Sequence, residues 1–193
     1  LDNLNSLRNL SEIEASRTIF ETFKKEINSL TVLDKGEAEI RDYIKISKCR
    51  PFVVKDQGYI VPKKSIFNKI IGDSHFELEF ASFFESCDDI ISYVKNYFAV
   101  HFKIDYKNAD GNISDYYPDY IVKVSPKEYY IVETKGREDL DDIEKIKRLE
   151  QWCVDVNANQ KNATYKMLYI KQEEWESQQQ KPRNFQKVIR VWI

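Results

Sequence analysis

Residues 117–139 read YPDYIVKVSPKEYYIVETKGRED, two apolar segments with charged residues at their ends. Residues 117–124 and 129–134 are rich in β-branched and aromatic side chains, which favour strands. The Ser-Pro-Lys between them is typical of a turn, so we expect a hairpin. The second segment begins with four consecutive apolar residues, as in a central strand that is covered on both faces. The stretch therefore predicts the middle of a β-sheet.

Three charged residues of this stretch are expected to meet at one edge of the sheet. Asp119 follows a proline at the start of the first strand, whereas Glu133 and Lys135 end the second. Residues two apart on a strand point to the same face, so Glu133 and Lys135 project together, and the hairpin can bring Asp119 beside them. Two carboxylates at strand ends offer the oxygen ligands that a hard divalent cation such as Mg²⁺ prefers.

A lysine beside two such carboxylates is typical of phosphodiester hydrolysis. A bound divalent cation lowers the pKa of its water and stabilises the charge that builds on a phosphate. We expect Lys135 to orient or deprotonate the attacking water, with a pKa that partial desolvation beside the metal shifts toward neutrality. The spacing alone is degenerate, and a solvated hairpin with a surface Glu–Lys pair is the alternative. The abrupt change from apolar to charged residues favours the site, because α/β sites tend to lie at strand ends.

The segments around the hairpin predict an α/β sandwich. The elements expected before it are a helix over 75–87, a strand over 98–106 and a turn over 108–111. The elements expected after it are a helix over 140–156, a strand over 165–170, a polar helical segment over 173–186 and a final strand over 188–193. Helix and strand periodicities of the apolar residues carry these expectations.

The first third of the chain has no motif with a recognisable chemistry. We expect residues 1–73 to form a mainly helical extension or connector, and residues 74–193 to form the domain that carries the site. Ser11 and Glu14 form a capping box at the start of an amphipathic helix over 11–30. A second helix is expected over 37–47, followed by a small hairpin that joins 53–54 to 59–61.

Composition narrows the class of protein. The chain has 193 residues, with 30 Lys and Arg against 32 Asp and Glu, which fits one folded domain and excludes a disordered chain. No apolar run approaches the roughly 18 residues that a membrane-spanning helix requires. The sequence LDNLNSLRNL at the start is not a signal peptide, and the missing Met suggests a piece of a longer polypeptide.

The cysteines and histidines indicate a reducing compartment rather than a metal site. Cys49, Cys87 and Cys153 lie far apart, without the spacing of a disulfide framework or a zinc site. His75 and His101 have no metal-ligand spacing either. We therefore expect reduced, mostly buried thiols in a cytoplasmic protein.

The chain resembles the PD-(D/E)xK nuclease superfamily. More narrowly, it resembles the C-terminal endonuclease domain of the restriction subunit of type III restriction enzymes. The resemblance spans about residues 74–170 and is carried by the segments Ser74–Phe84, Tyr117–Val122 and Tyr130–Asp139, with Lys145, Arg148, Trp152 and Cys153 downstream. It implies a restriction-endonuclease-like core, with a central mixed sheet flanked by helices. It also implies a Mg²⁺-dependent endonuclease that cuts double-stranded DNA, for which Mn²⁺ can substitute.

The same resemblance assigns roles to individual residues. Asp119 and Glu133 would be metal ligands and Lys135 the catalytic lysine. The superfamily often adds an acidic residue from the first helix, and Glu77 matches that position better than Glu79. Ser74 and Glu77 also form a capping box, so Glu77 can equally be a residue that starts the helix.

Four further residues are candidates for DNA contact. The family comparison puts Arg137 near a phosphate, which a guanidinium can hold through two hydrogen bonds. Lys145, Arg148 and Gln151 lie about one turn apart on the helix expected over 140–156 and could line the DNA side of the cleft. The alternative for all four is a solvated surface.

The resemblance also implies partners. The family nuclease normally accompanies an ATP-driven translocase and a modification (methyltransferase) subunit, and dimerisation would allow both strands to be cut. The sequence has no GxxxxGK[ST] phosphate loop, so ATP would act only through that translocase. Two other functions stay open: a non-catalytic DNA-binding or assembly module of the same fold, and a stand-alone repair or phage nuclease.

Overall fold

A four-stranded mixed sheet forms the centre of the protein. The computed structural model describes residues 12–30, 38–53 and 57–193. The strand order is β3-β6-β7-β8, with β6 antiparallel to both β3 and β7, and β8 parallel to β7. The strands are β3 (Ser92–Lys95), β6 (Tyr120–Ser125), β7 (Glu128–Lys135) and β8 (Thr164–Lys171).

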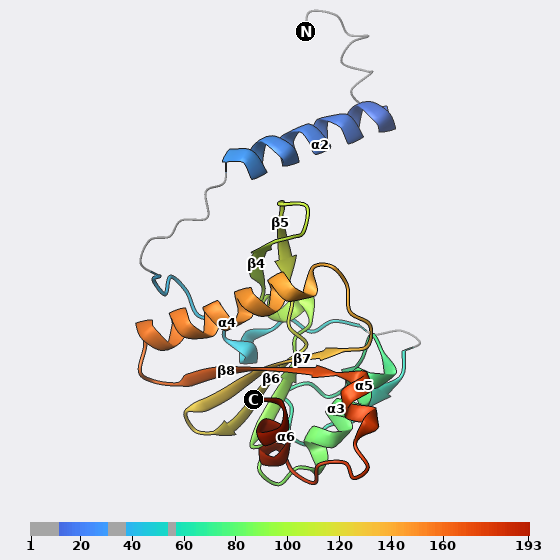
Figure 1. The fold of residues 1–193 in the computed structure, drawn as a ribbon, viewed down its shortest axis with the longest axis vertical. Coiled ribbons are helices and arrows are strands. Elements are labelled where there is room, and N and C mark those ends of the chain that lie inside the picture. The colour runs from blue at the N-terminus through green and yellow to red at the C-terminus, as the bar shows by residue number, and fades with distance from the viewer. Residues whose placement is uncertain (1–11, 31–37, 54–56) are drawn as a thin grey trace, which may run out of the picture.

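Helices cover both faces of this sheet (Figure 1). One face packs against α3 (His75–Ser86), α5 (Gln172–Ser177) and α6 (Phe185–Trp192), and the other against α4 (Asp142–Asn159). This architecture confirms the predicted α/β class with a central mixed sheet flanked by helices.

The expected hairpin lies at the centre of the sheet. Ile121 pairs with Ile131 and Tyr120 with Val132, so Asp119 sits just before β6 at the level of Glu133. Alternate residues of β6 and β7 then face opposite layers, as strand geometry requires. Tyr120 and Val132 enter the core below α3, whereas Ile121 and Ile131 face α4.

The core on the α3 side is mostly aromatic. Phe80, Phe84 and Trp175 are fully buried there, and the ring of Phe80 meets those of Phe84 and Trp175 at centroid distances of 5.7 and 4.5 Å. Such ring pairs add stability beyond the area they bury. Ile70, which precedes the boundary expected at residue 74, also belongs to this core. That domain boundary stays a prediction.

A separate hairpin extends from the α4 side. It consists of β4 (Ile104–Lys107) and β5 (Ile113–Tyr116), joined by the expected turn, in which Gly111 has a φ of 81°. A positive φ is easily adopted by glycine. The sequence did not reveal β5. Its last residue, Tyr116, is buried and reaches the strand ends of the central sheet.

The strand expected over 98–106 is only half correct. Residues Phe98–Val100 form a 3-10 turn that ends at His101, whose φ is 58°. This left-handed residue breaks the alternation, so β4 starts only at Ile104, and Phe98 is exposed rather than buried. The segment turns because Asn96 binds the carbonyl of Phe102 and pulls the chain back across the end of β3.

The final strand expected over 188–193 is wrong, because these residues belong to α6. Asn184 caps the helix by accepting a hydrogen bond from the N–H of Lys187. Phe185 and Val188 are fully buried, with Ile189 and Trp192 packed against the same core. That three-to-four-residue spacing is helical, and it outweighs the β-propensity of the individual residues. The polar segment expected over 173–186 is helical in α5 and again at its last two residues, where α6 begins.

Of the two helices expected in the N-terminal segment, the one over 11–30 is confirmed and the one over 37–47 is wrong. Helix α2 spans Ile13–Leu30, and its apolar stripe of Ile13, Phe20, Phe23 and Ile27 is exposed. Ser11 of the expected capping box lies outside the described residues. Residues 38–45 are not helical, and only Ile46–Lys48 forms a 3-10 turn. The Asp42 carboxylate accepts a hydrogen bond from the N–H of Tyr43, a local bond that competes with helix formation.

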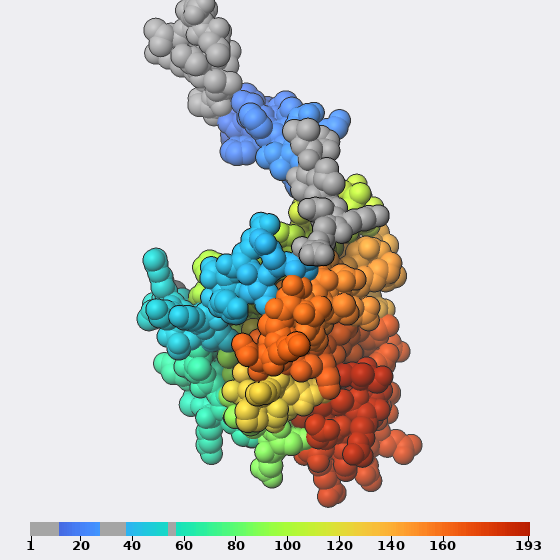
Figure 2. All heavy atoms as spheres, turned by 90° about the vertical axis from the view of Figure 1, so that its left-hand side faces the viewer, coloured from blue at the N-terminus to red at the C-terminus, as the bar shows by residue number. Residues whose placement is uncertain are grey.

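The strand over Tyr59–Ile60 forms, but it pairs with a different segment from the one expected. β1 (Tyr59–Ile60) pairs with β2 (Ile70–Ile71), whereas Val53 is exposed and Val54 lies outside the described residues. Figure 2 shows the segment around residues 38–53 lying against α4. No helix among the described residues is long and apolar enough to cross a membrane.

Candidate active site

Asp119 is held between the carboxyl ends of β3 and β7. Its backbone carbonyl accepts a hydrogen bond from the N–H of Asn96 at 2.7 Å. Its Oδ2 atom accepts two bonds from Thr134, one from the backbone N–H at 2.8 Å and one from Oγ1 at 2.6 Å. These bonds fix the orientation of the carboxylate and leave its other oxygen, Oδ1, to face the site.

Glu133 lies beside Asp119 in a poorly solvated position. Burial, and then the negative charge of Asp119, raise the pKa of Glu133 to about 8. Its Oε2 atom accepts a hydrogen bond from the hydroxyl of Tyr116 at 2.9 Å. The Tyr116 ring is buried, and its hydroxyl fixes the orientation of the Glu133 carboxylate.

A buried lysine that the sequence did not reveal links Asp119 to Glu77. Lys95, the last residue of β3, is 4 % exposed. Its ammonium lies 2.6 Å from Oε2 of Glu77 and 3.0 Å from Oδ1 of Asp119. Burial lowers the pKa of Lys95, but the two carboxylates more than offset it, so the net pKa is raised and the lysine is charged.

Glu77, rather than Glu79, is the helix residue that faces Asp119. The predicted capping box is present, because Ser74 accepts a hydrogen bond from the N–H of Glu77 and donates one to its carboxylate. The same carboxylate reaches Lys95, so the capping and site positions coincide. Glu79 instead accepts a bond from Trp175 at 2.7 Å.

Lys135 projects toward the start of α4. Its ammonium pairs with Asp142 at 2.7 Å and with Asp139 at 3.2 Å. Burial lowers the pKa of Lys135, but hydrogen bonds to the two aspartates raise it above the ordinary value. This direction is opposite to the expected shift toward neutrality.

The four candidate DNA-contacting residues separate into two groups. Arg137 is exposed in the loop after β7. Lys145 pairs at 3.2 Å with Asp139, which is also a partner of Lys135. Farther along α4, Arg148 and Gln151 both interact with Asp155. The structure therefore brings Arg137 and Lys145, but not Arg148 and Gln151, close to Lys135 in the fold.

The donors present suit a divalent cation in their chemistry. Asp119, Glu133 and Glu77 supply carboxylate oxygens, which Mg²⁺ and Mn²⁺ prefer. The raised pKa of Glu133 means that its charged form is costly where it lies, and a cation would relieve that cost. Within the described part of the chain, however, no three acidic, His or Cys side chains already converge closely enough to hold a metal ion. Lys95 stands between two of the three carboxylates instead.

A hollow of about 520 Å³ opens beside Asp119. Asp119 and Lys95 line it together with several aromatic side chains. Phe98 and Tyr117 pair across one side with ring centroids 4.8 Å apart. The remaining lining residues are Phe52, Ile71, Asp73, Asn96, Tyr97 and Ala99. Asp119 is therefore reachable from outside even though it is anchored on three sides.

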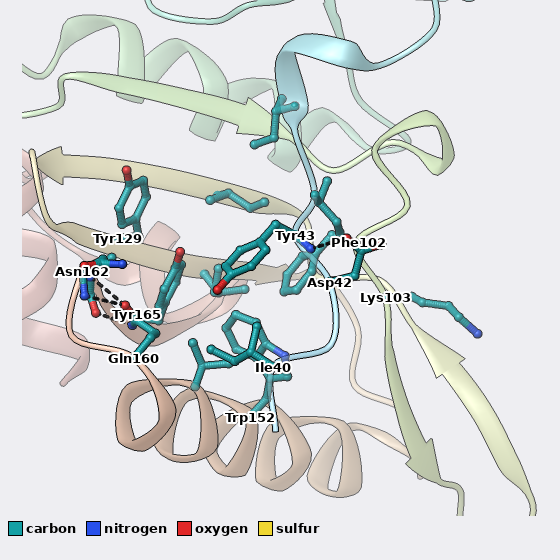
Figure 3. A pocket seen from close by; sticks show the side chains of 16 residues that line it. Ile40, Asp42, Tyr43, Phe102, Lys103, Tyr129, Trp152, Gln160, Asn162 and Tyr165 are labelled. Atoms are coloured by element: carbon teal, nitrogen blue, oxygen red, sulfur yellow. Dashed lines mark hydrogen bonds between the residues drawn. The ribbon is translucent and has the colours of Figure 1, made fainter. Parts of the chain in front are cut away.

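A second hollow, on the α4 side of the sheet, has no part in this site. Figure 3 shows Tyr43, Trp152 and Tyr165 around it, contributed by the N-terminal segment, α4 and β8. None of the residues predicted to bind metal or DNA lines it. Its walls are largely apolar and cover the far half of the sheet.

Three residues important to the geometry were missed in the sequence: Lys95, Tyr116 and Asp142. Lys95 is the last residue of a strand of only four residues, and lysine is rarely buried, so no sequence pattern marked it. Asp142, which is 3 % exposed, lies in a run of acidic residues that reads as an ordinary helix start. The acidic residues at 138–142, which follow Lys135 closely in the sequence, were the signal that could have suggested a partner for this lysine.

Comparisons with known proteins agree with this geometry. Residues 63–175 match a family described as endonuclease domain. No curated protein and no solved structure matches the chain. The family match spans more than half of the chain and confirms the resemblance to a restriction-endonuclease-like nuclease, while the narrower type III resemblance stays a prediction. The chain therefore belongs to the endonuclease domain family.

Proposed function

We propose that this chain is a divalent-metal-dependent endonuclease domain that hydrolyses phosphodiester bonds of double-stranded DNA. The observation that carries the proposal is the position of Glu133 next to Asp119, at adjacent strand ends and beside an open hollow. Two carboxylates so close in a poorly solvated place repel one another, which is unfavourable unless a cation joins them. The family match to an endonuclease domain supports the same function.

In this proposal the chain's own residues position the reacting groups. Asp119, Glu133 and Glu77 would hold Mg²⁺ or Mn²⁺, and Thr134 and Tyr116 orient two of these carboxylates. The bound cation supplies an activated water and stabilises negative charge on the phosphate. Lys135, charged in the structure, orients the attacking water or a phosphate oxygen as a hydrogen-bond donor.

DNA contact is proposed for Arg137, in the loop after β7, and for three polar residues of α4. Arg137 is exposed and Lys145 lies beside Lys135, so both can reach a backbone phosphate near the cut. Arg148 and Gln151 would have to exchange their Asp155 contacts for DNA farther along the helix. A phosphate contact of this kind gives affinity but no sequence preference.

The wider setting is proposed from the resemblance. We propose a type III-like restriction-modification enzyme in the cytoplasm, in which an ATP-dependent translocase and a methyltransferase subunit act with this domain. Dimerisation of the domain would let both strands be cut. The long match of YIVETKGRED to the family pattern supports this setting over a stand-alone nuclease.

The test is cleavage of supercoiled plasmid by the purified chain with Mg²⁺, and again after EDTA is added. We expect nicking that EDTA stops and that Asp119→Ala and Lys135→Ala abolish. Asp105→Ala, which removes an exposed carboxylate on β4, is the matched control and should nick like the parent. Equal nicking by the parent and the Asp119→Ala and Lys135→Ala variants would contradict the proposal. Metal-independent DNA binding without cleavage would favour a non-catalytic module.

A further inference from the structure

Lys95 occupies the space between two carboxylates that are proposed to hold a metal. Lys95 is only 4 % exposed, and its ammonium contacts Glu77 and Asp119 at 2.6 and 3.0 Å. It also lies 5.0 Å from the centre of the Tyr120 ring, which favours a cation at this place. The position is therefore built to hold one positive charge.

The oxygens that Lys95 contacts are the ones a metal would require. Oδ2 of Asp119 is already bound twice by Thr134, so Oδ1 is the oxygen left for a cation, and Lys95 takes it. Oε1 of Glu77 accepts from Ser74, whereas Oε2 accepts from the N–H of Asp73 and also pairs with Lys95. A divalent cation placed at the same oxygens would be repelled strongly by the ammonium, because like charges a few ångströms apart interact strongly in a buried site.

We propose that Lys95 is a resident cation that competes with the divalent metal for Glu77 and Asp119, so that the metal binds only when the lysine withdraws. The inference rests on the proposed function, because it concerns the same carboxylates. Lys95 is a positioning residue in this arrangement. It holds the two carboxylates together before metal arrives and limits metal occupancy of the free protein. The hollow beside Asp119, which Lys95 also lines, gives the displaced side chain somewhere to go.

If Lys95 competes with the metal, a substitution of this lysine should raise the affinity for metal rather than lower it. Removing a residue that helps to build the site weakens metal binding, whereas removing a competitor strengthens it. Lys95→Met keeps the length and the apolar stem but loses the charge. It should therefore bind Mn²⁺ at least about tenfold more tightly than the parent, because the metal no longer has to displace the ammonium.

The test is calorimetric titration of the full 193-residue chain with Mn²⁺ in the absence of DNA. Lys95→Met is compared with the parent and with Lys135→Met, which also removes a positive charge near Glu133 but one that is paired with Asp142 and Asp139. We expect a gain of at least about tenfold for Lys95→Met and less than about threefold for Lys135→Met. Thermal unfolding gives a second readout: Mn²⁺ should raise the melting temperature of Lys95→Met more than that of the parent.

Each other outcome has a definite meaning. Equal or weaker Mn²⁺ binding by Lys95→Met, with binding by the parent intact, overturns the competition and leaves the proposed nuclease standing. The absence of Mn²⁺ binding in the parent and both variants overturns the metal site itself, and with it this inference. If Lys95→Met does not fold without metal, Lys95→Gln and refolding in Mn²⁺ replace it. Recovery of the fold by Mn²⁺ supports the competition, and failure to recover contradicts it.

Discussion

The carboxyl ends of β3 and β7 lie on either side of Asp119 and differ in how they use their polar residues. β3 ends in Lys95 and Asn96, which are 4 % and 7 % exposed and bind inward to neighbouring chain. β7 ends in Glu133 and Lys135, which are only partly buried. Asn96 at the first end therefore acts as a fixed support, whereas the second end carries the residues proposed to act on DNA.

The difference follows from the position of each strand and from what each end contacts. Asn96 donates to the carbonyls of Phe102 and Pro118, both at 2.8 Å, so it holds the segment that carries Asp119. Lys135 contacts two aspartates at the start of α4, one of them half exposed. The pair with the half-exposed Asp139 can be exchanged for water or substrate at low cost, whereas the enclosed bonds of Asn96 cannot. Chemistry is therefore expected at β7 and support at β3.

The largest effect on DNA cleavage is expected at Glu133, near the end of β7. Glu133→Gln keeps the shape of the side chain but removes a charge that a metal would need. DNA nicking with Mg²⁺ should fall by at least about a thousandfold, which is about 4 kcal/mol of transition-state stabilisation. Single-turnover rates on supercoiled plasmid measure the loss. Retention of more than a tenth of the parental rate would remove Glu133 from the proposed site.

The next largest effect is a difference in folding stability between variants of Lys95 and Lys135. Without metal, Lys95→Met should lower the free energy of unfolding by about 3 kcal/mol, because it leaves two enclosed carboxylates with no cation. Lys135→Met should cost less than half as much, since Asp142 keeps Lys145 and the N–H of Asp139. Urea unfolding in EDTA measures both values. Equal losses would show that the two strand ends do not differ in the way described.

Asn96 tests the support at β3 without touching a charge. Asn96→Ala removes the side-chain hydrogen bonds to the carbonyls of Phe102 and Pro118 and leaves both carbonyls without this donor, which should cost about 2 kcal/mol of stability. Asn159→Ala is the matched control, because the Asn159 amide makes one exposed bond on α4. It should change the free energy of unfolding by less than about 0.5 kcal/mol. Similar losses in the two variants would count against a special role for Asn96.

The smallest effect concerns the exposed acid beside Lys135. Burial raises the pKa of Asp139, but the N–H of Asp141 and the ammonium groups of Lys135 and Lys145 lower it to about 2. A lowered pKa in the folded state means that the charged form adds stability at neutral pH. This contribution is lost as the pH falls from the ordinary value near 4 toward 2.

Asp139→Asn should therefore lower the melting temperature at pH 7, with a difference from the parent that disappears near pH 2 and shrinks in 1 M salt. Melting curves across this pH and salt range measure it. A difference that persists unchanged at pH 2 would mean that packing rather than charge gives the effect. Because the ion pairs of Lys95 are enclosed, the stability lost in Lys95→Met should not become smaller in 1 M salt.

The sequence was sufficient for the elements whose pattern is long and local. The hairpin of β6 and β7, helices α3 and α4, and the placement of Asp119 near Glu133 all follow from apolar runs with charged ends. The capping box of Ser74 and Glu77 also appears as expected. These features depend on contacts between residues that are near in sequence or joined by a short turn.

Other features depend on contacts between distant segments, and no local pattern could reveal them. Lys95 is recognisable only when β3 pairs with β6 and α3 lies across it. Tyr116 gains its role because β5 folds against the end of β7, and α6 forms because its apolar residues meet a core built by α3. Lys135 was placed correctly on β7, but its aspartate partners, which set the direction of its pKa, come from the next helix.

The most direct test of the account is a crystal structure of the chain soaked in Mn²⁺, with anomalous difference maps collected at the manganese absorption edge. The account predicts one dominant peak between Asp119 and Glu133, with the Lys95 ammonium turned away from Asp119. A peak elsewhere, or a Lys95 that still pairs with Glu77 and Asp119 beside a bound metal, would contradict it.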